Sequence, residues 1–256
     1  MSEPTRVFKA GAMNVRVFAD EPSLATDAAR AAQGILQNAI SRQGCAAAIL
    51  ATGNSQLQFL EQLVKIGGVD WSRVTLFHMD EYLGLSADHP ASFRTYMRER
   101  VASALKPRTF HYMEGDAMEP IAECERYANL IAAQPIDLCC LGIGENGHLA
   151  FNDPPVADFK DPKPAKIVKL DLACRQQQAG EGHFPNIDAV PQYALTLTIP
   201  ALCSAKSMLC IVPEKRKAQA VKDSLNGPIG TVCPGSFLRE QAHCTLYLDA
   251  DSASLI

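Results

Sequence analysis

The sequence lacks several features that would at once assign it to a class of protein. It contains no apolar run close to the roughly 20 residues of a membrane-spanning helix, and no cationic, apolar leader opens it. Its formal net charge of -4 provides no basic field for nucleic acid or for an anionic membrane. We therefore expect a cytoplasmic protein whose partner is a small molecule, with no nucleic-acid and no membrane partner.

Motifs for metals and dinucleotides are also missing. The 9 cysteines include no C-x-x-C pair, no H-E-x-x-H is present, and the glycine cluster that begins at Gly142 is not G-x-G-x-x-G. Several cysteines lie inside apolar runs, where a reduced thiol packs as a small hydrophobe. The sequence therefore predicts no metal site and no dinucleotide site, and it places these thiols in the core.

The chain does contain enough apolar sequence for a large core. Of its 256 residues 47% are hydrophobic, and short apolar runs of strand length alternate with amphipathic segments of helical period. This pattern is typical of the α/β class, here three α/β/α layers in one domain with a mostly parallel, Rossmann-like sheet. Strands are expected at 15–19, 46–51, 73–78, 136–142, 207–212 and 244–248, and helices at 23–41, after residue 55, and at 92–105, 120–133 and 214–225.

No repeat and no linker divides the sequence, so we expect a single domain over residues 1–256. From 171 to 190 the hydrophobic periodicity fails, and Gly180 and Gly182 flank Glu181. This interruption predicts a mobile lid near 153–190.

In an open parallel sheet, ligands bind where the strands end, so two candidate phosphate sites stand out. Thr52, Gly53, Asn54 and Ser55 follow a predicted strand and open a helix, which suits backbone donation to an anion, although an ordinary N-cap turn fits equally. The second site is the cationic run 215–217 at the start of a helix. It opposes the helix dipole unless an anion lies nearby, and its alternative is a solvated basic patch.

Two further strand ends carry groups for proton transfer. Asp80 and Glu81 follow the strand 73–78, and burial of adjacent acids raises a carboxyl pKa toward that of a general base; alternatively one acid caps a turn. His148 emerges from the glycine-rich turn after the fourth strand, with Asp153 five residues later. A proton-carrying histidine and a purely structural one both remain open.

Two long strings resemble the glucosamine-6-phosphate deaminase family. They are H-M-D-E-Y-L-G-L at 78–85, followed by H-P-A-S-F, and L-G-I-G-E-N-G-H-L-A-F-N-D-P at 141–154. The T-G-N-S loop, the segment 190–196 and the helix at Lys217 occur in matching order, so the likeness covers nearly the whole chain. The related phosphogluconolactonases typically read D-E-R and G-H-T-A-S at these two places.

The resemblance implies an aldose–ketose isomerisation coupled to loss of ammonia from an amino-sugar phosphate, without a cofactor, in a possible homo-oligomer. It makes Asp80 the base that moves a proton between C2 and C1, and His148 the group that opens the sugar ring. The phosphate pocket implied by it comprises Thr52, Gly53, Asn54, Ser55 and Lys217. It places Glu81, Gly144 and Gly147 beside the substrate.

Three departures from the family accompany these matches. Asn146 stands where well-studied deaminases have Asp, and Asp153 stands where they have Glu. We expect Asp153 to orient His148, with Glu145 or a water supplying the lost charge. No arginine at 179–184 matches the family's phosphate-gripping lid residue, and Arg175 or His183 are its candidate substitutes. A 6-phosphogluconolactonase-like hydrolase and a non-catalytic sugar-phosphate sensor are the alternative functions.

Overall fold

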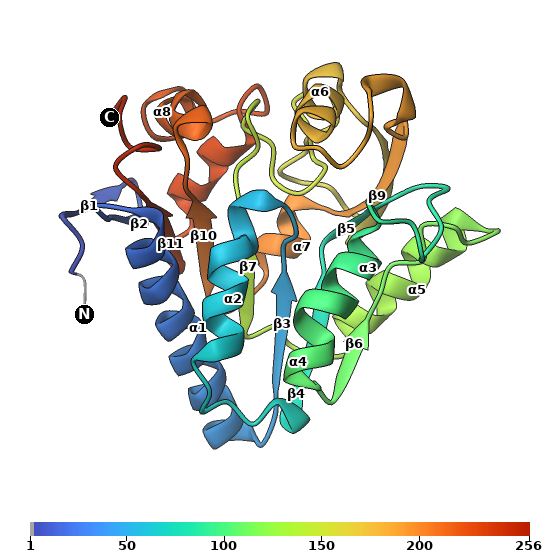
Figure 1. Cartoon of the computed structure of the whole chain (residues 1–256), viewed down its shortest axis with the longest axis horizontal. Coiled ribbons are helices and arrows are strands. Elements are labelled where there is room, and N and C mark those ends of the chain that lie inside the picture. Colours follow the sequence, from blue (N-terminus) through green and yellow to red (C-terminus); the bar gives the residue numbers. More distant parts are fainter. Residues whose placement is uncertain (1–2) are drawn as a thin grey trace.

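An eight-stranded sheet forms the centre of the computed structural model, which describes residues 3–256 (Figure 1). The strand order is β1-β2-β11-β10-β7-β3-β4-β6, and every pair is parallel except the antiparallel β1–β2 edge. All six predicted strands occur in it, which confirms the mostly parallel sheet. The strands are β1 (Arg6–Ala10), β2 (Met13–Val17), β3 (Ala46–Leu50), β4 (Val74–His78), β6 (Thr109–His111), β7 (Leu138–Leu141), β10 (Met208–Val212) and β11 (Cys244–Leu248).

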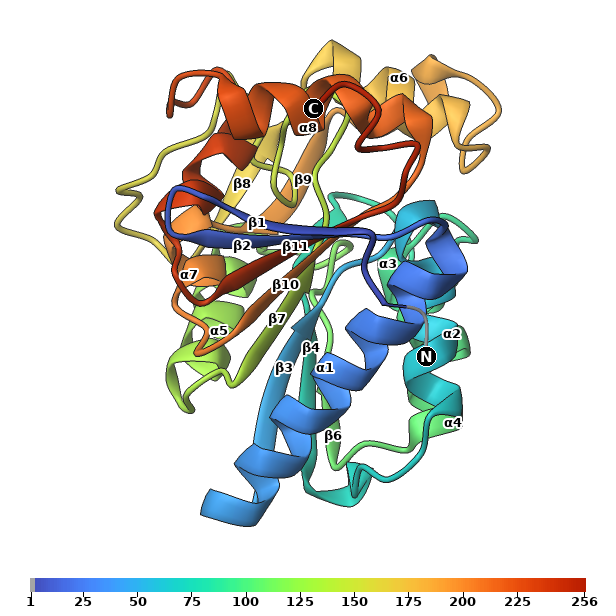
Figure 2. The same cartoon turned by 90° about the vertical axis from the view of Figure 1, so that its left-hand side faces the viewer.

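Helices cover both faces of this sheet (Figure 2). One layer consists of α1 (Glu21–Gln43), α2 (Leu57–Lys65), α3 (Phe93–Met97) and α4 (Ser103–Leu105); the other consists of α5 (Pro120–Ala132) and α7 (Ile199–Cys203). A π-helical turn, Arg98–Ala102, joins α3 to α4, so the helix expected at 92–105 forms as one helical segment. The three-layer α/β/α arrangement is confirmed.

The central strands pack against two hydrophobic cores, one on each face of the sheet, because successive side chains of a strand point to opposite faces. In β3 every residue is buried; Ala47 and Ile49 pack into one apolar cluster, while Ala48 and Leu50 pack into the other. A run of small and branched apolar residues without polar alternation is what burial on both faces requires.

A second, three-stranded antiparallel sheet was not expected from the sequence. It has the order β5-β9-β8, with β5 (Asp80–Tyr82), β9 (Tyr193–Leu197) and β8 (Ala165–Lys169). Because β8 is hydrogen-bonded to β9, residues 165–169 are part of a sheet and not of a loose lid. The helix α6 (Leu172–Gly180), where no regular element was expected, lies with α8 (Ala218–Asn226) across the end of the large sheet (Figure 1).

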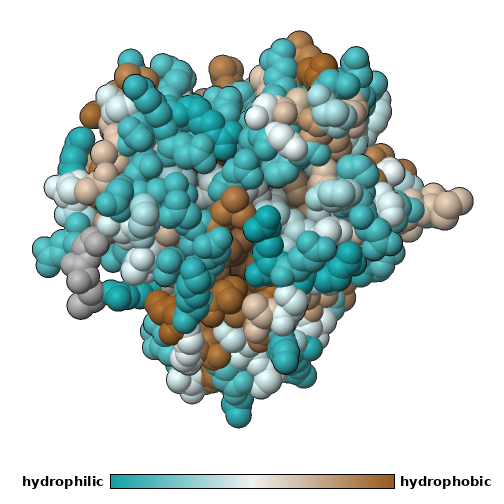
Figure 3. Space-filling model, viewed as in Figure 1, coloured by the Kyte–Doolittle hydropathy of each residue, from teal (hydrophilic) through white to brown (hydrophobic). Residues whose placement is uncertain are grey.

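Two expectations from the sequence concern membrane-spanning helices and the cysteines. Within residues 3–256, no helix is long and apolar enough to cross a membrane. All nine cysteines are free, and five of them are buried, whereas Cys45 is exposed. The face in Figure 3 is mostly hydrophilic; hydrophobic residues gather from its centre downward, and smaller groups of them lie along its upper and right-hand edges.

Candidate active site

The loops that follow β3, β4, β7 and β10 meet at one cavity of about 70 Å³. Parallel pairing puts the carboxyl ends of these strands at the same edge of the sheet, where α6 and α8 cover them. The predicted site residues that the structure brings together along its wall are Thr52, Gly53, Ser55, Asp80, Gly144, His148 and Lys217.

The loop after β3 presents backbone and hydroxyl groups to this cavity. Gly53 has φ +103°, a conformation that L side chains rarely adopt, and it opens a 3₁₀ turn, Asn54–Gln56, that leads into α2. The side chain of Asn54 is used elsewhere, since its amide donates to the backbone carbonyl of Glu181 at 3.3 Å. Thr52, Gly53 and Ser55 are therefore the members of this loop that line the cavity.

Lys217 supplies a buried positive charge to the wall of the same cavity. It lies in the 3₁₀ turn Lys215–Lys217 and is only 2% exposed. Burial, together with the neighbouring charge of Arg216, lowers the pKa of its ammonium group. A buried cation is stabilised by an anion, so this end of the cavity favours a negatively charged ligand group.

Asp80 and Glu81 point to opposite sides of β5, and only Asp80 lines the cavity. Burial first, and then the charge of Glu81, raise the pKa of Asp80 well above its ordinary value. Glu81 is fully buried and accepts hydrogen bonds from Ser92 Oγ at 2.7 Å and from the Phe93 and Arg94 N–H groups at 3.2 and 3.0 Å. Glu81 was expected beside the substrate, but in this structure it does not line the cavity, because its carboxylate caps α3.

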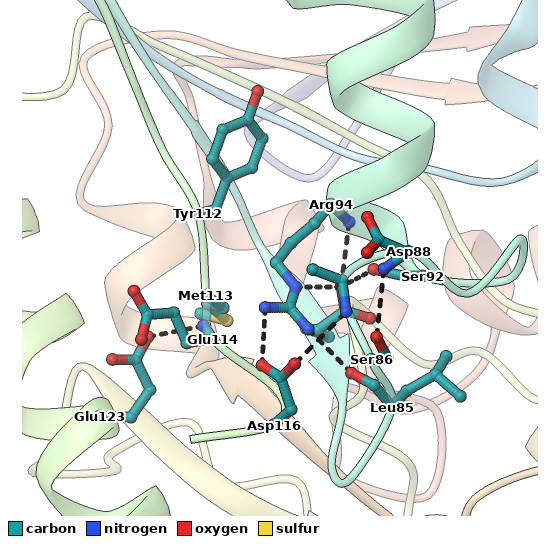
Figure 4. Close-up of polar contacts among 12 residues, drawn as sticks. Leu85, Ser86, Asp88, Ser92, Arg94, Tyr112, Met113, Glu114, Asp116 and Glu123 are labelled. Atoms are coloured by element: carbon teal, nitrogen blue, oxygen red, sulfur yellow. Dashed lines mark hydrogen bonds and ion pairs between the residues drawn. The ribbon is translucent and has the colours of Figure 1, made fainter. Parts of the chain in front are cut away.

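The segment between β5 and α3 is fixed by Arg94 (Figure 4). Its guanidinium donates to Asp116 Oδ1 and to the carbonyl of Leu85, both at 2.8 Å, and Figure 4 shows these groups gathered beneath the start of the helix. Phe93, the first residue of α3, lines the cavity. The loop after Asp80 is therefore held by buried polar contacts.

His148 lies against Asp153 on the opposite wall. Its Nδ1 is 2.9 Å from Asp153 Oδ1, but the N–H does not point at that oxygen, so the contact is close without being a well-aligned hydrogen bond. Asp153 is fully buried and also accepts from Asn146 Nδ2 and from the backbone N–H of Asp171, each at 3.0 Å. Burial alone raises the pKa of Asp153, and the contacts with His148 outweigh burial and lower it.

Asn146 connects the two ends of this turn. Its amide donates to Asp153 while its Oδ1 accepts from the backbone N–H of His148 at 3.1 Å. A side chain with both a donor and an acceptor makes both contacts, whereas an ionised Asp offers only acceptors. Asn146 therefore positions the histidine and its carboxylate and does not itself reach the cavity wall.

Two neighbours of His148 lie away from the cavity. Glu145 was expected to supply charge to His148, but its side chain is 41% exposed and pairs with Arg216 at 3.1 Å. Gly147 has φ +85°, and a Cβ there would lie 2.7 Å from Cys233 Sγ, so Gly147 packs against this cysteine and not against substrate. Gly144 does line the cavity.

Helix α6 and the turn after it contribute wall residues that the sequence did not predict: Gln177, Gln178 and Glu181. Gln178 accepts a hydrogen bond from the Tyr82 hydroxyl at 2.7 Å, and Gln177 accepts one from the backbone N–H of Glu145 at 3.0 Å. The available signal was a run of three glutamines in a segment without an apolar face.

Neither candidate substitute for a lid arginine faces the cavity in this state. Arg175 donates to the carbonyls of Ile187 and Val190 at 2.7 and 3.0 Å, which secures the turn after α6. His183 lies 3.5 Å from Glu181 through its Nε2.

One group of metal-ligand side chains occurs among residues 3–256. His148, Asp153 and Cys174 have ligand atoms within 4.8 Å of one another, and all three are buried. Asp153 already accepts two hydrogen bonds, and burial raises the pKa of the Cys174 thiol well above its ordinary value. A metal would have to displace that proton, so the group is a weak candidate for a metal centre.

Comparison with known proteins identifies relatives over most of the chain. The model of the glucosamine-6-phosphate isomerases/6-phosphogluconolactonase family matches residues 19–247. A glucosamine-6-phosphate deaminase of Exiguobacterium sibiricum is 37% identical over 207 residues, which are 81% of this chain and 80% of the relative. One from Listeria innocua is 35% identical over 81% of this chain and 86% of its own.

Comparison with solved structures finds the same two kinds of enzyme, a deaminase and a lactonase. A monomeric glucosamine-6-phosphate deaminase superposes with a TM-score of 0.86 at 32% identity, over 94% of this chain and 99% of the other. A 6-phosphogluconolactonase from Shewanella baltica superposes with a TM-score of 0.75 at 18% identity, over 92% of this chain and 96% of the other. At this lower identity only the fold is shared.

Replacing Asp80 by Asn is expected to stabilise the fold at neutral pH. Because the pKa of Asp80 is higher in the folded protein than in the unfolded chain, its ionisation at pH 7 favours unfolding, by about 1.4 kcal/mol for a tenfold difference between the two acid constants. Toward pH 4 and below, the unfolded chain also takes up the proton and the gain shrinks. Urea unfolding at pH 7 and pH 4 measures the gain in the free energy of unfolding, with Asp251→Asn at an exposed position as the control. An equal gain at both pH values would contradict this prediction.

Gly144→Ala is expected to displace the His148 ring. A Cβ at this position would lie 2.2 Å from the imidazole, so the ring must move and lose its contact with Asp153. NMR of the imidazole nitrogens reports that contact, and thermal unfolding reports the fold. Gly34→Ala is the matched control, since nothing lies within 4 Å of its added Cβ. An unchanged His148 signal in Gly144→Ala would refute the crowding argument.

Proposed function

The chain belongs to the glucosamine-6-phosphate isomerase/6-phosphogluconolactonase family, and we propose that it is an amino-sugar-phosphate deaminase. It converts glucosamine 6-phosphate, or an epimer, and water into a ketose 6-phosphate and ammonia. The observation that carries this proposal is the placement of Asp80 and His148 on the wall of the same cavity as Gly53, Ser55 and Lys217. One ligand with a phosphate at one end and a sugar carbon chain at the other meets all of them.

The phosphate binds at the loop after β3. Backbone N–H groups around Gly53, the hydroxyls of Thr52 and Ser55 and the buried ammonium of Lys217 supply donors and positive charge there. The Asn54 side chain contributes by joining this loop to the segment after α6.

Asp80 acts as the general base. In the open-chain sugar it removes the proton on C2 and returns it to C1. The C1 oxygen gains a proton and the amine loses one, so that C1 becomes a CH2OH group and C2 becomes an imine. Water then adds to this imine, and ammonia leaves. Burial favours proton uptake because it raises the pKa of Asp80 toward the working pH.

His148 opens the sugar ring by protonating the ring oxygen. Asp153 stabilises the charged imidazole across the 2.9 Å contact, and Asn146 holds both partners through its two hydrogen bonds. Hydrogen bonds in a substrate-free site are often poorly aligned and tighten when substrate binds, which fits the off-line N–H of His148. Gly144 leaves the space that the ring occupies.

The lid consists of α6 and the turns that follow it to residue 190. Its polar contacts reach three site loops, through Asn54, Tyr82 and Glu145. The cavity beneath it measures about 70 Å³, against the 300–1,000 Å³ of usual ligand sites, so the lid opens to admit a hexose phosphate.

The two alternative functions have less support. Solved 6-phosphogluconolactonases resemble the chain in fold alone, at 18% identity in the case described above. A non-catalytic sensor has no use for a buried carboxylate such as Asp80 facing its ligand. Release of acid from 6-phosphogluconolactone without ammonia from amino sugars would favour the hydrolase.

The proposal predicts ammonia release with matching formation of fructose 6-phosphate when glucosamine 6-phosphate is offered, and galactosamine 6-phosphate is tested in parallel. Asp80→Asn is expected to lower kcat by about 10²- to 10⁴-fold, because the base is lost. The fold of this variant is checked by thermal unfolding. Turnover that persists in Asp80→Asn would remove Asp80 as the base, and ligand-induced thermal stabilisation without turnover of either sugar would support the sensor instead.

Activity should also depend on pH through Asp80. Only the ionised carboxylate can accept a proton, and the pKa of Asp80 is raised. As the pH is lowered, kcat/KM should therefore begin to fall while the pH is still well above the ordinary Asp pKa of about 4. A profile that stays flat down to pH 4, with the enzyme still folded, would contradict this assignment.

A further inference from the structure

The carboxylate of Glu181 stands in the wall of the cavity at the end where the phosphate binds. Its side chain is only 6% exposed, Oε1 lies 2.6 Å from Arg216 Nη1, and Gln177 Nε2 donates to the same oxygen at 2.9 Å. Burial opposes ionisation, but the contacts with His183 and Arg216 outweigh it and lower the pKa of Glu181 to about 2. Glu181 therefore carries a full negative charge at neutral pH.

This charge conflicts with a bound phosphate. Glu181 shares the cavity wall with Gly53, Ser55 and Lys217, and a phosphate ester carries between one and two negative charges near pH 7. Like charges repel strongly where water is excluded. The cavity measures about 70 Å³ in this conformation, below the roughly 300 Å³ of the smallest usual ligand sites. Glu181 must leave before a phosphate enters.

Arg216 is the group that Glu181 leaves behind. Its guanidinium contacts three carboxylates, with Glu145 at 3.1 Å, Glu181 at 2.6 Å and Glu214 at 2.6 Å. Of these only Glu181 lines the cavity. When the lid carries Glu181 away, Nη1 of Arg216 loses its shortest contact and keeps only the longer one to Glu145. Arg216 directly precedes the cavity-lining Lys217 in the same 3₁₀ turn.

We propose that Arg216 is a further phosphate-binding residue, which Glu181 occupies in the substrate-free enzyme and which the phosphate takes over on binding. This rests on the proposed function, because it assumes a phosphate at this end of the cavity. A planar guanidinium matches phosphate as well as carboxylate geometry, so one anion replaces the other on the same donor. The arrangement also gives specificity, since an unphosphorylated sugar has no anion with which to displace Glu181.

The test measures binding of inorganic phosphate by calorimetry at low ionic strength, without turnover. Glu181→Gln is expected to bind phosphate about tenfold more tightly than the wild type, since a like charge has been removed from the site. Arg216→Gln is expected to bind phosphate about 10- to 100-fold more weakly than the wild type. The affinity of Arg216→Lys should lie between these two, because the positive charge remains but the paired N–H donors of the guanidinium are lost. Thermal unfolding of each variant establishes that it is folded.

Glu145→Gln is the matched control. It neutralises another carboxylate on the same guanidinium, but one that lies outside the cavity, so phosphate affinity should change less than about twofold. Equal tightening in Glu145→Gln and Glu181→Gln would show a general charge effect and overturn the proposal. Wild-type phosphate affinity in both Arg216 variants would overturn it as well.

Kinetics separate this proposal from the proposed reaction. In a working deaminase, Arg216→Lys should raise KM for the amino-sugar phosphate with little change in kcat, because the phosphate is remote from C1 and C2. If no amino-sugar phosphate is turned over but the binding pattern holds, the reaction assignment fails and the phosphate exchange stands. If turnover is normal and phosphate affinity is unchanged by the substitutions at residues 181 and 216, the proposed phosphate exchange is contradicted and the proposed reaction is supported.

Discussion

The parallel pairing of β4, β3, β7 and β10 is the constraint on which the site depends. Parallel strands end at the same edge, so loops as far apart in the sequence as those of Thr52 and Lys217 reach one cavity without any special contact to draw them together. Each loop then needs only local devices to aim its side chain. Gly53 provides an unusual backbone angle, and Gly144 leaves room for an imidazole ring.

Three buried carboxylates near this edge differ in how they are satisfied. Glu81 accepts hydrogen bonds from the start of α3, and Asp153 accepts them from Asn146 and Asp171 beside the charge of His148. Asp80 is also buried, but within residues 3–256 its carboxylate receives no side-chain hydrogen bond. Satisfied carboxylates hold structure, whereas the unsatisfied one retains its affinity for a proton. The same burial thus reduces stability and, in the proposed reaction, provides the base.

The sequence predicted six of the eight strands of the large sheet and seven of the 18 residues that line the cavity, since the apolar strands and the polar residues after them can be read directly from the pattern. It did not predict β5, β8 and β9, because β5 has only three residues and polar residues interrupt the apolar sequence of β8 and β9. Glu81 was misplaced because adjacency in sequence does not show which side of a strand faces a ligand; in β5 it alternates with Asp80. Gln177, Gln178 and Glu181 were missed because a polar helix over a polar cavity has no hydrophobic periodicity.

The proposed exchange of Glu181 for a phosphate would let a site with few unpaired cations recognise a dianion. In the substrate-free state Arg216 is neutralised by the chain's own carboxylates, so its charge is not buried without a partner. Exchanging Glu181 for a phosphate preserves that pairing and leaves Glu181 to water outside, which avoids the desolvation cost of burying a new, unpaired ion. The glycines on either side of Glu181 allow this residue to move as a unit with the end of α6 while β8 and β9 remain fixed. Opening the lid and binding the phosphate are therefore coupled through one guanidinium.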